Sequence, residues 1–171
     1  MSLLSRLLGS RADDRAPVRP LWHRIVELSR DPDWYTTCGI ADTVPGRFDA
    51  VTLVLSAVLL RLEREPELMG HAARLTELFV DDMDAQLRQS GVGDLVVGKH
   101  VGKLMATLGG RLGALREALP LGESAVAEVI ARNVSLLDGA GPEPLASALL
   151  KLRTSWERLP LEAFLAGRLA P

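Results

Sequence analysis

The sequence is poor in the side chains that form disulfides, bind metals or act as nucleophiles. It contains one cysteine, Cys38, so no disulfide can form within the chain, and this favours a reducing compartment. Its three histidines, His23, His71 and His100, are not spaced as metal ligands with one another or with Cys38. Because Cys38 also has no base at a suggestive spacing, we expect neither a metal site nor a thiol nucleophile.

The sequence also lacks a long apolar run. Its longest apolar stretch covers residues 50–60, whereas a membrane-spanning helix needs about 20 such residues. This stretch therefore predicts a buried core helix. The first eleven residues (MSLLSRLLGSR) are too few for a secretion signal and form a small basic amphipathic turn. We interpret them as a frayed tail, with contact to a membrane surface or a partner as the alternative.

The composition is that of a globular protein with little net charge. The chain has 171 residues, 47% of them apolar, and a formal net charge of −2. A chain of this length can bury about 70% of its unfolded surface in one core, without disulfides or metals. The small net charge does not favour a DNA-binding protein, because DNA binding requires a strongly basic surface.

Helical signals fill most of the chain. Residues 10–20 are polar and contain two prolines, so we predict a flexible segment over 1–19 and one helical domain over 20–171. Apolar spacing and breakers predict helices over 21–30, 47–62, 66 to about 90, after Gly98 to about 115, 124–137, 144–157 and 160–167. No segment alternates as a strand does. The predicted fold is all-α, with six to seven packed helices.

Residues 91–103 (GVGDLVVGKHVGK) contain the glycine and lysine spacing of a phosphate-binding P-loop. A P-loop follows a strand and carries Ser or Thr after its lysine, because that hydroxyl binds Mg²⁺. Here a predicted helix precedes the loop and His100 takes the place of the hydroxyl. We therefore expect no nucleotide site.

A structural role explains the glycines of this stretch. Gly91 and Gly93 are expected to end the preceding helix in a left-handed turn. Asp94 is expected to cap the next helix, and Gly98 to allow a close approach of two backbones.

The same stretch begins a basic segment. Between residues 99 and 116 there are four fixed positive charges and no carboxylate. These charges are Lys99, Lys103, Arg111 and Arg116, and they indicate either a solvated face or a partner-binding surface. Asp94, just ahead of them, is a further candidate for contact with a partner.

Three blocks of the sequence, in order and spacing, resemble one family. They are residues 38–49 (CGIADTVPGRFD), residues 79–99, which contain FVDDMD and GVGDLVVGK, and the weaker match 131–133 (ARN). Together they are similar to the ubiquinol–cytochrome c chaperone family over about residues 20–135. The sequence departs from the family pattern at Ala41 and Pro45, at Gly102 between the lysines, and at 108–111 (LGGR) in place of an aromatic version.

The resemblance implies an all-α assembly chaperone with neither cofactor nor catalysis. Its mitochondrial relatives bind newly made cytochrome b, together with a small partner protein, near the ribosomal exit. For a bacterial member, the resemblance implies assembly of the same respiratory complex at the inner membrane. Such a protein would be cytoplasmic and could associate with that membrane. The mitochondrial matrix face is the alternative location.

The acidic residues of the second block are expected to have a structural role. Asp81 and Asp84 share a helix face, and we expect a structural ion pair between this face and Arg47 or Arg88. We predict that Arg47 lies close to Asp81 or Asp84 and so joins the first two blocks. Asp42, Thr43 and Gly46 are expected to form the turn and cap before the central helix.

Three classes of function follow from these patterns. An assembly chaperone would hold its apolar client in a groove between helices, rimmed by the basic residues from Lys99 to Arg116, which could also face anionic lipid. A homo-oligomeric scaffold would instead use its apolar surplus as an interface between copies. A small helical enzyme would need the Asp81/Asp84 face to converge on a closed pocket.

Overall fold

The computed structural model describes residues 13–91 and 93–170, and these form an all-α domain, as predicted. Its six longer helices are α2 (Arg19–Leu28), α4 (Val44–Leu62), α5 (Met69–Gln89), α6 (Asp94–Ala118), α7 (Glu123–Asn133) and α8 (Glu143–Glu157). Two short helices, α3 (Asp33–Thr36) and α9 (Leu161–Leu165), and three 3₁₀ turns, η1 (Ala16–Val18), η2 (Pro66–Leu68) and η3 (Leu119–Leu121), complete the described elements.

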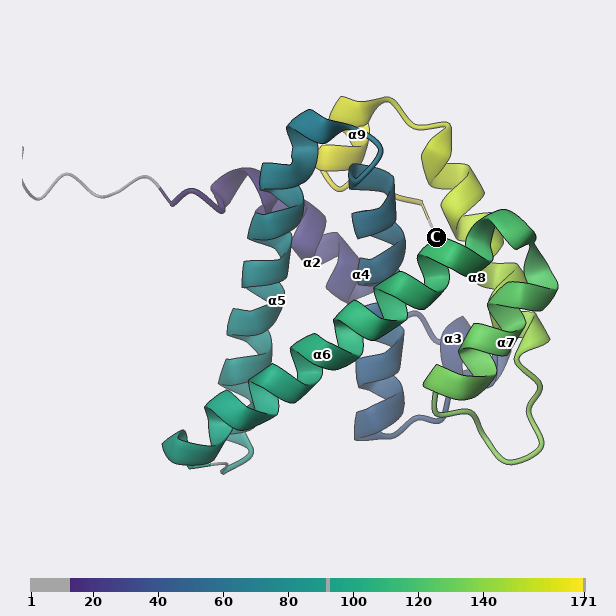
Figure 1. Cartoon of the computed structure of the whole chain (residues 1–171), viewed down its shortest axis with the longest axis horizontal. Coiled ribbons are helices and arrows are strands. Elements are labelled where there is room, and N and C mark those ends of the chain that lie inside the picture. The colour runs from purple at the N-terminus through teal and green to yellow at the C-terminus, as the bar shows by residue number, and fades with distance from the viewer. Residues whose placement is uncertain (1–12, 92, 171) are drawn as a thin grey trace, which may run out of the picture.

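The helices are arranged around α4, which most of the others cover (Figure 1). Helix α6 runs diagonally across α5 and α4, α2 lies behind them, and α7 and α8 form the opposite side of the molecule. Twelve of the nineteen residues of α4 are buried, which agrees with the continuous apolar run there. None of the helices in the described part of the chain is long and apolar enough to span a bilayer.

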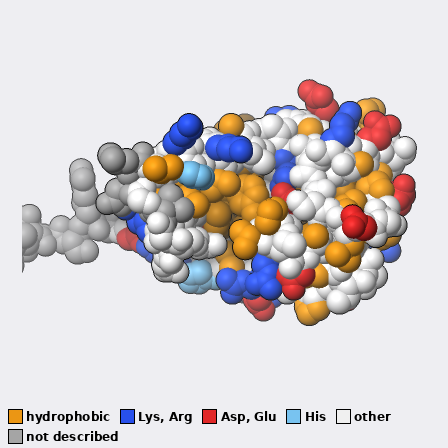
Figure 2. All heavy atoms as spheres, turned by 90° about the horizontal axis from the view of Figure 1, so that it is seen from below, with side chains coloured by type: hydrophobic (Ala, Val, Ile, Leu, Met, Phe, Trp, Pro, Cys, Tyr) orange, Lys and Arg blue, Asp and Glu red, His pale blue; other side chains and the backbone are white. Residues whose placement is uncertain are grey.

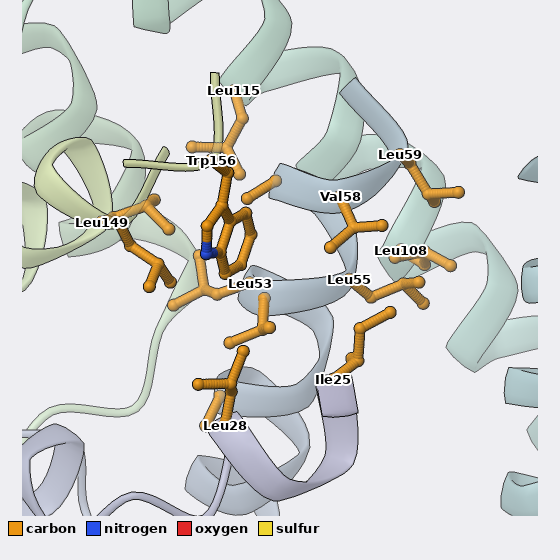
Figure 3. Packing of buried hydrophobic residues seen from close by; sticks show 14 of the residues in the cluster. Ile25, Leu28, Leu53, Leu55, Val58, Leu59, Leu108, Leu115, Leu149 and Trp156 are labelled. Atoms are coloured by element: carbon orange, nitrogen blue, oxygen red, sulfur yellow. The ribbon is translucent and has the colours of Figure 1, made fainter. Parts of the chain in front are cut away.

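One hydrophobic core joins these helices (Figure 3). Leu53, Leu55 and Val58 of α4 lie at its centre, with less than 2% of each side chain exposed. The labelled neighbours are Ile25 and Leu28 of α2, Leu108 and Leu115 of α6, and Leu149 and Trp156 of α8. Each fully buried side chain of this size contributes about 1.5–3 kcal/mol to folding, so this cluster is the main source of stability.

Several predicted boundaries were wrong. Helix α6 begins at Asp94 and contains Gly98, which had been assigned to a loop. Helix α7 ends at Asn133 and not near residue 137, because residues 134–137 pair with the loop before α4. Within that pairing the Ala41 N–H donates to Ser135 O at 2.8 Å, and the Leu137 N–H donates to Gly39 O at 2.9 Å.

Ordered structure is present ahead of the predicted domain start at residue 20. Turn η1 precedes α2 directly, and Val18 is fully buried. The predictions for residues 1–12, including the basic amphipathic turn, lie outside the described residues.

Candidate functional site

Arg111 is buried and does not line a partner-binding rim, contrary to the sequence prediction. Only 2% of the residue is exposed, and its Nη2 lies 2.8 Å from the Oδ1 of Asp49. The guanidinium also donates to Thr52 Oγ1 and to the carbonyl of Asn133. The second Asp49 oxygen accepts the Ser135 N–H at 2.8 Å. This arginine therefore joins α4, α6 and the chain after α7.

Arg116 is exposed but forms an ion pair within the domain. Its Nε and Nη2 donate to the two carboxylate oxygens of Glu63 at 3.0 and 2.8 Å, and this bond raises the pKa of Arg116. The ion pair ties the end of α6 to the residue that follows α4. Much of the charge that was predicted to face a partner is thus neutralised within the domain.

Lys99 and Lys103 are the predicted cations that remain unpaired among the residues described. Both are exposed, and no described carboxylate lies within salt-bridge distance of either ammonium group. Each follows an inward-facing valine, Val97 or Val101, by two residues, which is about 200° around a helix. The lysines therefore lie on the outer side of α6, away from its buried stripe.

The turn between α5 and α6 explains the P-loop spacing. The chain passes from helix to turn to helix, without the strand that precedes a P-loop. Gly91 has a φ of +83°, so its left-handed role is confirmed, whereas Gly93 has a φ of −67° and is itself the N-cap of α6. The cap role predicted for Asp94 is therefore wrong, and its side chain lies outside the described ones.

Gly98 is not a point of close backbone approach. A Cβ placed on this residue would meet no atom within 4 Å. Gly46 does need its small size, because an added Cβ would lie 1.9 Å from the carbonyl oxygen of Ala41. The role predicted for Thr43 is confirmed, because its Oγ1 accepts the Gly46 N–H at 3.2 Å at the start of α4.

The prediction that Arg47 pairs with Asp81 or Asp84 was wrong. Arg47 binds Asp42 instead, with 2.7 Å between Nε and Oδ1, and this hydrogen bond lowers the pKa of Asp42. Asp81 pairs with Arg15. Asp84 pairs with Arg88, so the predicted ion pair of this face with Arg88 is confirmed. An aromatic contact joins the two sequence blocks in their place, since the rings of Phe48 and Phe79 lie 6.2 Å apart.

The described carboxylates do not converge on a closed acidic pocket. Asp81 and Asp84 have separate arginine partners, and Asp82 accepts the indole N–H of Trp22 at 2.8 Å. Within the described ranges, no three His, Cys, Asp or Glu side chains are grouped as metal ligands. These contacts give the acidic stripe of α5 a packing role.

A cleft of about 230 Å³ lies where α4, α6 and α8 end. It is lined by Arg61, Arg64, Arg116 and Arg153, together with Glu63 and Glu157 over an apolar floor. Glu157 binds both Arg64 and Arg153, at 3.2 and 2.8 Å. The arginines therefore serve to tie three helix ends together, where positive charge also complements the helix dipoles.

The opposite end of the molecule presents an apolar surface. Figure 2 looks at the end where α4 begins and α5 meets α6, and a broad hydrophobic area lies there with Lys and Arg side chains on two sides. The half-buried apolar side chains of these helix segments, which we call the apolar face, are Phe48, Val51, Val80, Leu104 and Met105. Sequence reasoning did not single them out, because their helical spacing is also that of core residues.

The described part of the chain is therefore an all-α domain with a partly exposed apolar face, in which a helix, a turn and a second helix stand in place of a P-loop. The chain belongs to the ubiquinol-cytochrome C chaperone family, whose model matches residues 36–170, and this confirms the resemblance found in the sequence.

The fold is similar to a solved bacterial structure, that of the Cbp3 homolog from Brucella abortus. The two chains share 28% sequence identity with a TM-score of 0.79, over 98% of this chain and 96% of that one. No curated protein matches the chain. The similarity covers the whole helical arrangement, including the α5–α6 end that carries the apolar face.

Proposed function

We propose that this protein is a non-enzymatic assembly chaperone that binds newly made cytochrome b and promotes assembly of the ubiquinol–cytochrome c reductase complex. Membership of the family supports the assembly role. The observation that supports client binding is the apolar face, because a chaperone for a membrane protein must cover apolar segments before they reach the bilayer.

The charges near this end define a second part of the proposal. Lys99 and Lys103 are exposed on the outer side of α6, where they would contact anionic lipid headgroups or a small partner protein near the ribosomal exit. Client binding and this electrostatic contact are therefore assigned to different sides of the same helix. The protein would work in the cytoplasm against the inner membrane, or at the matrix face if it is mitochondrial.

The test is capture of cytochrome b from the protein's native cells in mild detergent. Val51→Lys with Met105→Lys should abolish capture, because two ammonium groups would stand on the apolar face. Leu121→Lys is the matched control, since Leu121 is an apolar residue with 77% of its surface exposed and lies in η3. Circular dichroism would establish that all three proteins are folded.

The double variant Lys99→Glu with Lys103→Glu tests the electrostatic contact of α6 separately from client binding. We expect this variant to retain cytochrome b in detergent and to lose binding to vesicles that contain anionic lipid. Loss of cytochrome b with the lysine variant, and its retention with the apolar-face variant, would reverse the assignment. If the wild-type protein captures no cytochrome b in cells that are making the complex, the proposed client is wrong.

A further inference from the structure

Helix α6 contains glycines that its packing does not require. Gly98, Gly102, Gly109 and Gly110 all lie inside the helix, and a Cβ placed on any of them would meet no atom within 4 Å. Alanine would therefore fit at each position and would favour the helix. Since neither a left-handed φ nor a close contact accounts for these four residues, their effect is to leave the first part of α6 easy to deform.

The second part of α6 is fixed. Arg111 follows the glycine pair at 109–110 directly and binds Asp49 and the carbonyl of Asn133 at the end of α7. Leu115 is fully buried, and Arg116 binds Glu63. Any movement of α6 must therefore occur ahead of Arg111.

The first part of α6 is held lightly. Among residues 96–108 only Val97 and Leu108 are buried, and Leu108 directly precedes Gly109, so it would move least in a pivot there. Leu104 and Met105 pack against the core as half-buried side chains. Thr107 donates its hydroxyl to the carbonyl of Lys103 at 3.0 Å, a bond that often bends helices. At the other end, Gly91 adopts a left-handed φ of +83° after α5, and Gly93 is the N-cap of α6.

We propose that residues 96–108 of α6 form a lid that pivots at Gly109–Gly110 and lifts from α5 to admit an apolar helical segment of the client. Lifting takes the half-buried side chains of Leu104 and Met105 away from the core against which they pack and opens the contact between α6 and α5. The surface exposed by this movement would form one continuous binding surface with Phe48 and Val51 of α4. This inference rests on the proposed function, because it states how the apolar face is opened to its client.

The experiment compares two stiffened variants of the full-length protein. Gly109→Ala with Gly110→Ala should slow amide hydrogen exchange in residues 96–108 about tenfold and reduce capture of newly made cytochrome b to a similar degree. Gly113→Ala is the matched control, since Gly113 lies in the same helix with equally open space but beyond Arg111. It should leave both the exchange of residues 96–108 and the capture unchanged.

Two results would overturn the lid. One is equal exchange of residues 96–108 in the double variant and the wild type, and the other is slowed exchange with unchanged capture. If the wild-type protein captures no cytochrome b, the proposed function fails separately. The lid proposal is then tested by amide hydrogen exchange together with binding of the apolar dye anilinonaphthalene sulfonate. Dye binding that is not reduced in the double variant would refute the lid.

Discussion

At the scale of single residues, the reactivity of a side chain in this protein depends on its burial as well as on its chemical type. Cys38 is the only thiol of the chain, and 6% of it is exposed, beside the loop that leads to α4. Burial raises the pKa of this thiol, and the nearby Asp33 adds to the effect. The thiolate, which is the reactive form, is therefore scarce in the folded state at neutral pH.

We predict that Cys38 in the native protein reacts with Ellman's reagent far more slowly than in urea-unfolded protein at pH 8. The pKa of the Cys38 thiol is higher in the folded protein than in the unfolded chain. The ratio of the unfolded rate to the native rate should therefore fall as the pH rises from the pKa of the unfolded thiol toward that of the folded thiol. Stopped-flow absorbance measures both rates. A native rate equal to the unfolded rate would contradict the burial of this side chain.

At the scale of an element, the start of α4 depends on one close backbone approach. Thr43 caps the helix, and Gly46 lies so near the carbonyl of Ala41 that no side chain fits. The loop before α4 is in turn held by its pairing with residues 134–137. The position of the first turn of α4, which carries Phe48 of the apolar face, follows from these contacts.

We predict that Gly46→Ala destabilises the protein by about 1–3 kcal/mol, as other overpacking substitutions do. Gly98→Ala, where there is open space, should instead stabilise it by up to about 1 kcal/mol, because alanine favours a helix over glycine. Urea unfolding followed by circular dichroism measures both changes. Equal effects of the two substitutions would show that the contact with Ala41 is unimportant.

At the scale of the whole molecule, one buried ion pair connects the two sides of the domain. Asp49 and Arg111 join α4 and α6 to the chain after α7, and both residues are more than 90% buried. Burying two charges is costly, so such a pair adds little net stability when complete. Removing one partner leaves the other charge buried without compensation.

We predict that Asp49→Ala lowers the free energy of unfolding by about 3–5 kcal/mol. Arg116→Ala, which breaks the exposed pair with Glu63, should cost less than about 1 kcal/mol. Denaturant unfolding compares the two, and a small effect of Asp49→Ala would mean that water reaches Arg111. Replacing Asp49 and Arg111 together by apolar residues should restore much of the loss.

The all-α fold and the presence of the helices were predicted correctly from the sequence, although not all of their ends, because helical spacing, prolines and glycines act over a few residues. The family was predicted correctly from the order and spacing of its sequence blocks. The cap at Thr43 and the left-handed turn at Gly91 are local in the same sense. The charged site was predicted less well. Arg111 and Arg116 have the same side chain and lie five residues apart, yet only Arg111 is buried.

Tertiary packing alone decided which charges pair and which surfaces stay open. Arg111 of α6 binds Asp49 of α4, and α7 ends early because residues 134–137 pair with the loop before α4. The apolar face depends on the crossing of α6 over α4 and α5, which the sequence spacing of any one helix does not specify. Periodicity shows which side of a helix is apolar, whereas only the packing of its neighbours decides whether that side is covered.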